Sequence, residues 1–187
     1  PDTNQRQKPY RPHLTNRRPK LRTRLEPLGR TEGVASWQRY IDKHNRLGSI
    51  SAQLIKAADD AGKAWAVENP ADRGLPDSPA WWRNLGRDHA PLWIMPDINE
   101  AIRDAKGHMR TFAQCNFGAP VQKWTTIAHS NDLSELAPLD LRLCLHGRRA
   151  HEFTAQGRTA NGSSRSTAAA AYPAEMNEFL AQAITAH

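Results

Sequence analysis

Apolar side chains recur at three- and four-residue steps along the segment that follows residue 31. The recurring positions are Trp37, Tyr40, Ile41, His44, Leu47, Ile50, Leu54, Ile55 and Ala58. Thr31 stands near the start as a candidate cap, and Gly62 supplies a stop. The pattern predicts one long amphipathic helix, eased at Gly48.

The apolar run at 64–67 comes directly after Gly62 and predicts a short buried strand. This strand should end at Glu68-Asn69-Pro70, which puts an acid, an amide and a proline where a strand meets a loop. Open α/β sheets hold their catalytic groups at such positions. The same tripeptide also makes an ordinary strand-ending turn, so the residues that follow must decide between the two readings.

The segment 71–96 is rich in proline and contains Trp81, Trp82 and Trp93. It should be irregular but ordered, because closely spaced tryptophans seek burial and order a loop by packing. A lid over the core and a substrate-facing loop are both compatible with this composition.

Three further patterns complete the expected elements. Apolar positions at 98, 101, 102 and 105 predict a short helix. Strands are expected at 111–115 and 124–129, on either side of a Gly-Pro turn, as a hairpin or as adjacent members of a sheet. Pro173 should open a final helix whose apolar face packs in the core. That face consists of Met176, Phe179, Leu180, Ala183 and Ile184.

Composition limits the class of protein. A chain of 187 residues with 39% apolar and 24% charged residues can bury one sizeable core, and no run approaches the roughly 18 apolar residues of a membrane span. We therefore expect a soluble α/β domain at 31–187 and no membrane partner. Two cysteines make no disulfide scaffold, so we expect an intracellular, reducing compartment, nuclear or organellar.

The excess positive charge is concentrated in residues 1–30, which carry nine Lys or Arg against two acidic residues, whereas 31–187 carry 17 against 17. Five prolines in the same segment predict an extended basic arm. Such an arm favours salt-sensitive phosphate contacts with DNA or RNA, and a solvated tail is the alternative. The candidate contacts in the arm are Arg11, Arg17, Arg18, Lys20, Arg22 and Arg24.

A cluster of metal-binding residue types follows later in the chain. Cys144, His146 and His151 lie within eight positions, with Cys115 or His129 as a possible fourth ligand of a tetrahedral zinc site. Arg148 and Arg149 lie inside this cluster and make it a second candidate contact with nucleic acid. A polar phosphate-facing loop without metal is the alternative interpretation.

The order of these motifs resembles the C-terminal half of cytosine-C5 DNA methyltransferases, in the divergent forms found in phages and retroelements. The matching motifs are Glu68-Asn69-Pro70, a Trp/Pro-rich spacer, the Cys-Asn-Phe-Gly turn at 115–118, Lys123-Trp124-Thr125 and the Cys/His stretch. The resemblance covers roughly residues 20–185 and implies a partial Rossmann-like, doubly wound sheet with flanking helices.

The resemblance also implies roles for single residues. Glu68 would bind the Watson–Crick edge of a flipped cytosine, with Asn69 and Pro70 shaping the turn. Lys123 would match a basic residue that the family keeps near the catalytic pocket, while a surface lysine on a sheet edge is the alternative.

Two departures from the family argue against an active enzyme. No cysteine precedes Glu68, although the reaction needs a thiolate nucleophile upstream of that strand. No glycine-rich turn for S-adenosylmethionine follows a predicted strand. This cofactor is therefore expected only if an upstream half is present.

Two functions follow from these departures. The first is a catalytically incomplete module that binds nucleic acid alongside other protein subunits, in a DNA-associated element or in a ribonucleoprotein such as an organellar ribosome. The alternative is the C-terminal half of an active DNA cytosine-C5 methyltransferase that requires an upstream cofactor-binding segment.

Overall fold

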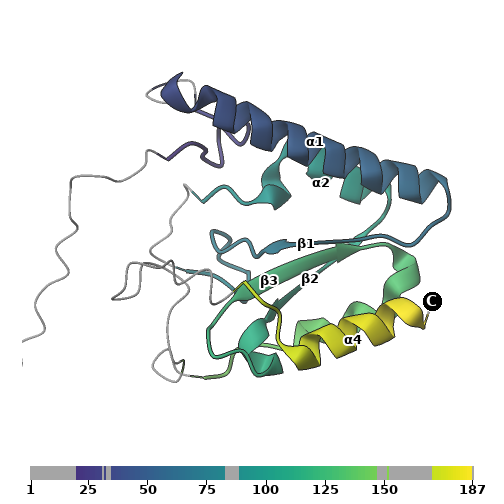
Figure 1. Cartoon of the computed structure of the whole chain (residues 1–187). Helices are drawn as coiled ribbons and strands as arrows, with labels where there is room; N and C mark the ends of the chain where they lie inside the picture. The colour runs from purple at the N-terminus through teal and green to yellow at the C-terminus, as the bar shows by residue number, and fades with distance from the viewer. Residues whose placement is uncertain are drawn as a thin grey trace, which may run out of the picture.

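The computed structural model describes residues 20–30, 32, 35–82, 89–146, 151 and 170–186. They form a mixed α/β fold in which helices flank a small antiparallel sheet (Figure 1). The helices are α1 (Gln38–Asp60), α2 (Pro96–Asp104) and α4 (Ala174–Thr185), and the strands are β1 (Ala66–Pro70), β2 (His108–Ala113) and β3 (Trp124–His129). Short 3-10 helices are η1 (Ala35–Trp37), η3 (Leu92–Ile94), η4 (Gln114–Phe117) and η5 (Asn131–Leu141).

The long helix predicted after residue 31 is confirmed as α1, and Gly62 ends it in a left-handed conformation with φ of 60°. Its buried residues are Ile41, Gly48, Ala52 and Ile55. The helix continues through Gly48 without a break. A Cβ at this position would lie 2.6 Å from the Met95 Cε, so the glycine permits close packing with the segment before α2. Thr31 lies outside the described residues.

The core has one layer on each face of the sheet. Helices α1 and α2 cover one face through Ala52, Ile55 and Ile98, which pack with Trp93 of η3 and Ala128 of β3. On the other face, α4 and η5 pack against Phe112 and Ile127 of the sheet. Four buried side chains of this second layer are Leu133, Leu136, Leu139 and Met176. The sheet is therefore the middle of three layers (Figure 1).

The first strand begins later than the sequence indicated. Strand β1 pairs with β3 from Ala66↔His129 to Pro70↔Thr125, so Glu68-Asn69-Pro70 lies inside the strand and does not follow it. Trp65 of the predicted run is buried with α1 and α2 before the strand starts. Proline is tolerated here because β1 is an edge strand and Pro70 is its last residue.

The described strands are antiparallel throughout, in the order β1-β3-β2. A doubly wound sheet requires parallel strands joined by crossover helices, and the described residues contain no parallel pair. The expected strand at 111–115 is likewise corrected to β2, because Gln114 and Cys115 belong to η4. Gly118 ends η4 with φ of 82° and lets the chain turn back into β3, whose predicted bounds are confirmed.

Residues 20–30 were expected to belong to an extended arm, but they form a closed loop on α1. The Arg30 amide donates to the Leu21 carbonyl at 3.0 Å. The Arg22 guanidinium donates to the Ile41 carbonyl, and the Asn45 amide donates to the Leu28 carbonyl. These bonds make the loop part of the folded body, whereas residues 1–19 lie outside the described part of the chain.

The final helix is confirmed as α4, although Pro173 precedes its first residue instead of occupying it. Met176 and Ala183 are buried and Phe179 and Leu180 are partly buried, but Ile184 is 53% exposed. Among the described helices, none has the length and apolar character needed to cross a bilayer.

Candidate metal centre and the neighbouring carboxylate

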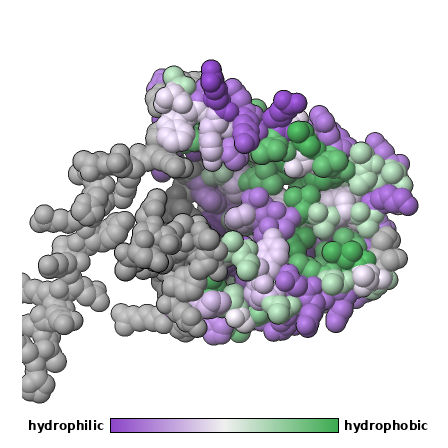
Figure 2. All heavy atoms as spheres, viewed as in Figure 1, coloured by the Kyte–Doolittle hydropathy of each residue, from purple (hydrophilic) through white to green (hydrophobic). Residues whose placement is uncertain are grey.

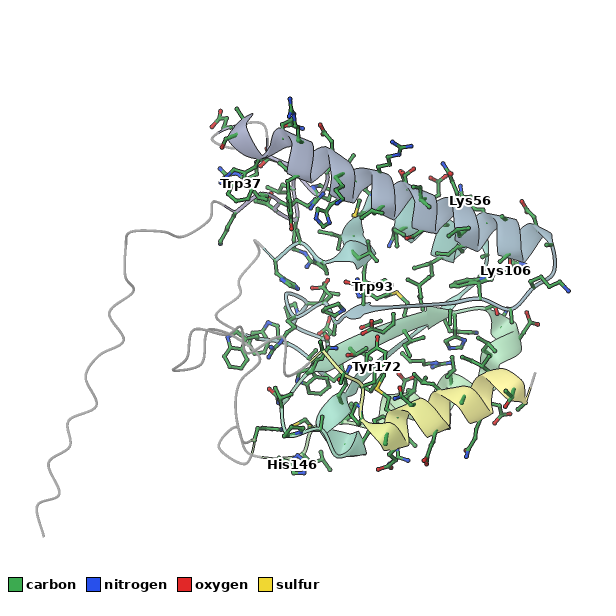
Figure 3. All side chains as sticks on the ribbon, viewed as in Figure 1. Trp37, Lys56, Trp93, Lys106, His146 and Tyr172 are labelled. Carbon is green, nitrogen blue, oxygen red and sulfur yellow. The ribbon has the colours of Figure 1, made fainter. Side chains whose placement is uncertain are left out.

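Four metal-binding side chains converge at the end of the sheet from which η4 leaves. The possible ligand atoms of Cys115, Cys144, His146 and His151 all lie within 4.8 Å of one another. The Cys144 Sγ lies 3.5 Å from the His151 Nε2 and 4.0 Å from the His146 Nδ1. Figure 3 shows His146 near the lower edge of the molecule.

Backbone contacts place the two cysteines together. Cys115 lies in η4, and hydrogen bonds hold the segment that carries Cys144 beside it. The Ala113 amide donates to the Arg142 carbonyl at 2.8 Å, and the Asn116 side chain donates to the Leu143 carbonyl at 3.1 Å. Residues 142–144 therefore continue the hydrogen bonding at the end of β2, which brings the Cys144 side chain to Cys115.

The cluster has a mixed environment. Cys115 is buried, Cys144 and His151 are half-buried, and His146 is exposed. Burial, followed by a hydrogen bond with Cys144, raises the pKa of the Cys115 thiol to about 12. Gln122 donates to the Cys144 Sγ at 3.2 Å, and the His151 Nδ1 is buried without a hydrogen-bond partner among the described residues.

Two thiols and two imidazoles are a donor set that suits zinc. Tetrahedral coordination with Zn–S of about 2.3 Å and Zn–N of about 2.0–2.1 Å places neighbouring ligand atoms about 3.3–3.8 Å apart. Atoms that already lie within 4.8 Å need to move by only about 1 Å to meet this geometry. The residues therefore fit a zinc ion of the closed, structural kind, in which the protein fills all four positions.

Of the two candidates for the fourth ligand, Cys115 and His129, only Cys115 lies with the other three residues. Cys115 belongs to the cluster, whereas His129 lies at the far end of β3 and is fully buried. The His129 Nδ1 lies 2.8 Å from the Ser130 carbonyl, and its Nε2 accepts from Arg110. Both ring nitrogens of His129 are thus engaged in the core.

Glu68 forms a second polar site on the face of the sheet that α4 covers. Its carboxylate accepts a hydrogen bond from Tyr172, and burial together with this bond raises the pKa of Tyr172. The Glu68 Oε1 atom is buried with no partner among the described residues. Figure 3 shows Tyr172 between the sheet and the start of α4, so this residue closes one side of the site.

Lys123 contacts the same site. Its ammonium lies 5.0 Å from the centre of the Tyr172 ring, in a cation–π contact. The adjacent residue, Gln122, is the one that binds Cys144. Gln122 and Lys123 are adjacent in sequence, so this two-residue segment contacts both the metal-binding cluster and the Glu68 site. Tyr172, which no sequence motif singled out, supplies the link.

The other two residues of the tripeptide have supporting positions. Asn69 pairs with Thr126 in the sheet. The Pro70 carbonyl accepts a hydrogen bond from the Trp93 indole at 3.0 Å, which ties the end of β1 to the segment before α2. Trp93 is buried, Trp81 is 46% exposed, and Trp82 stacks with Arg73, so the three tryptophans of this segment have different environments.

The candidate phosphate contacts divide into three groups. Arg22 and Arg24 have intramolecular partners: Arg22 binds α1, and Arg24 forms a bidentate ion pair with Asp72 at 2.9 and 2.8 Å. Lys20 is exposed. The remaining candidates, Arg11, Arg17, Arg18, Arg148 and Arg149, lie outside the described residues.

No family model, no curated protein and no solved structure matches this chain. The candidate sites therefore rest on the chemistry and geometry of its own residues. They define an α/β fold with two polar sites, a Cys2His2 cluster that could hold a metal ion and the half-buried carboxylate of Glu68, which Gln122, Lys123 and Tyr172 connect.

Proposed function

We propose that this chain is a catalytically incomplete, cytosine-C5-methyltransferase-like module that binds nucleic acid and uses one structural zinc ion to fix the two ends of a basic binding segment. One observation carries the proposal. His146 and His151 converge on the two cysteines, and Arg148 and Arg149 lie between these two histidines in the sequence. A zinc ion would therefore clamp both ends of a short segment that contains two arginines.

Clamping favours binding because a segment with fixed ends loses less conformational entropy when it meets its target. Arginine suits the target, since its planar guanidinium binds phosphate in a bidentate manner. The basic residues of 1–19 supply further phosphate contacts. Arg22 and Arg24 are left out of this role because both are engaged within the fold.

Nucleic-acid binding should respond to salt in a way that identifies these contacts. Each phosphate contact contributes about 0.9 to the slope of log K against log salt for duplex DNA, and about 0.7 for single strands. Replacing Arg148 and Arg149 with glutamine should therefore lower the slope by up to about 1.4–1.8. Fluorescence anisotropy with labelled RNA and DNA across a salt series measures this change.

The matched control is Arg103→Gln, because Arg103 is an exposed arginine on α2, away from the metal-binding cluster. Its salt slope should equal that of the wild type. An unchanged slope after replacement of Arg148 and Arg149 would show that these two arginines do not contact nucleic acid. If the wild type binds neither RNA nor DNA, the proposed function is wrong.

The alternative function is the C-terminal half of an active methyltransferase. It is favoured by Glu68, whose half-buried carboxylate keeps one oxygen without a partner among the described residues. Such an oxygen can accept a hydrogen bond from the amino group of a cytosine that has flipped out of the base stack. The Rossmann-like assignment belongs to this alternative, because parallel strands would have to come from the upstream segment that binds the cofactor.

S-adenosylmethionine separates the two functions. The proposed module should show no saturable binding of this cofactor in calorimetry. The alternative predicts binding and methyl transfer to cytosine once an upstream cofactor-binding segment is added, with loss of transfer in Glu68→Gln. Methyl transfer in that mixture would overturn the incomplete module in favour of the active half.

A further inference from the structure

Helix α1 has a second apolar stripe, separate from the face that packs on α2. Its large members are exposed among the described residues: Tyr40 (44%), Leu47 (50%), Ile50 (41%) and Leu54 (66%). Tyr40, Leu47 and Leu54 are seven residues apart, and Ile50 follows Leu47 by three. This is the a and d spacing with which one helix packs along another.

The stripe runs along an outer layer of the molecule. Helix α1 lies outside α2, with the sheet beyond (Figure 1). In the space-filling view, hydrophilic side chains project from the outer side of α1, and hydrophobic side chains gather along its inner flank and towards the sheet (Figure 2). Exposed apolar residues at regular helical spacing on one element indicate an interaction surface.

The charges of α1 identify its partner. Residues 38–49 contain three basic side chains and one acidic, whereas 50–60 contain one basic and two acidic. A second copy of the same helix, running in the opposite direction, would place the basic half of each against the acidic half of the other. Antiparallel pairing also aligns the two helix dipoles favourably.

We propose that this chain forms a homodimer in which α1 packs antiparallel against α1 of a second copy. With a positions facing d positions, Leu47 lies opposite Ile50 at the centre. Tyr40 then lies opposite Ala57, so a large side chain meets a small one. The same register places Arg39 opposite Asp60 at both ends of the interface, and both residues are exposed.

Parallel pairing is less favourable for two reasons. It would bring Lys43 against Lys43 of the second copy inside the seam, where like charges repel. It would also place Arg39 near His44 and leave Asp60 without an opposite charge. The antiparallel register avoids both conflicts and gives two identical ion pairs, as a two-fold axis requires.

Sedimentation velocity of the full chain, free of nucleic acid, tests the proposal. The wild type should pass from monomer to dimer within a range of about 1–100 µM, as expected for a modest interface. Ile50→Glu should raise the dissociation constant by more than about 30-fold, because it puts a charge at the centre of the seam. Its melting temperature should stay near that of the wild-type monomer, since Ile50 lies outside the core.

A charge exchange tests the register. Arg39→Glu and Asp60→Arg should each weaken the dimer by about three- to tenfold, as expected for two exposed ion pairs. The double variant restores both pairs with reversed charges and should return to within about twofold of the wild type. Absence of rescue would overturn the antiparallel register.

Two further outcomes would overturn the proposal as a whole. The first is a wild type that stays monomeric over the entire range. The second is a dimer that appears only after removal of residues 1–19, which would show that the arm covers the stripe. A wild type that stays monomeric would leave the zinc site and nucleic-acid binding unaffected, because the stripe shares no residue with either.

Discussion

Replacing Cys144 with serine is expected to abolish stoichiometric zinc binding and to lower the melting temperature of the zinc-loaded protein. Cys144 lies at the centre of the cluster, within hydrogen-bonding range of both histidines and of Gln122. Even residues that only support metal ligands typically change affinity by about 10- to 100-fold, so loss of a ligand should exceed about 100-fold. Competition with a chromophoric chelator measures the affinity.

Two controls define the result. His108→Asn replaces an exposed histidine of β2 outside the cluster and should keep the zinc affinity of the wild type. In zinc-free buffer, Cys144→Ser and wild type should melt at similar temperatures, because a bound ion stabilises only the protein that can hold it. A Cys144→Ser variant that retains zinc at wild-type affinity would show that the four residues do not form the site.

Replacing Arg24 with alanine should lower the free energy of unfolding by up to about 3 kcal/mol, since it leaves the carboxylate of a largely buried ion pair without its partner. The Asp72 side chain is 10% exposed and the Arg24 side chain 22% exposed. The pair also ties the loop at 20–30 to the end of β1. Urea denaturation followed by tryptophan fluorescence measures the loss.

Arg30→Ala is the matched control for Arg24→Ala. Arg30 is more exposed and lies 3.7 Å from Glu26, so its removal should cost less than about 1 kcal/mol. Arg24→Ala should also leave the salt slope of nucleic-acid binding unchanged under conditions where it is folded. A lowered slope with full stability would instead return Arg24 to the group of phosphate contacts.

The same ion pair predicts a pH dependence. Burial alone would raise the pKa of Asp72, but the hydrogen bonds from Arg24 and the Gly74 amide lower it overall. Because the folded pKa lies below the unfolded value of about 3.9, the pair stabilises the protein above that pH. Its contribution should be lost as the pH falls through the folded pKa, and Arg24→Ala should show a smaller loss than the wild type.

Local patterns predicted most of the elements but not their arrangement. The periodicity of α1 and the bounds of β3 could be read from the sequence, because each depends on side chains within one segment. The antiparallel order of the strands depends on pairing between distant segments, which periodicity does not encode. The resemblance to a doubly wound family pointed to parallel strands and so misled the prediction.

The 3-10 helix η5 is an element that the sequence analysis missed although a signal exists. Leu136 and Leu139 are buried and spaced by three residues, which is the period of a 3-10 helix, whereas Leu133 is also buried but has non-helical φ and ψ at a kink in η5. A search for apolar residues at alternating steps of three and four, as in an α-helix, does not detect leucines that recur at every third position. Pro138 inside the segment also speaks against an ordinary α-helix.

The candidate site was predictable in its ligand types and not in its geometry. Cys144, His146 and His151 are close in sequence, so their grouping needed no fold. Identifying Cys115 as the fourth ligand, in place of His129, required the structure. The contact between η4 and residues 142–144 connects positions that are nearly 30 residues apart in the sequence. Tyr172 could not be assigned to Glu68 because it lies more than 100 residues away and belongs to no motif.

Zinc X-ray absorption spectroscopy on the purified full chain tests the central claim most directly. The account predicts one zinc per chain, with a first shell of two sulfurs at about 2.3 Å and two nitrogens at about 2.0–2.1 Å. A chain that holds no zinc after reconstitution, or a shell of oxygen atoms without sulfur, would contradict it.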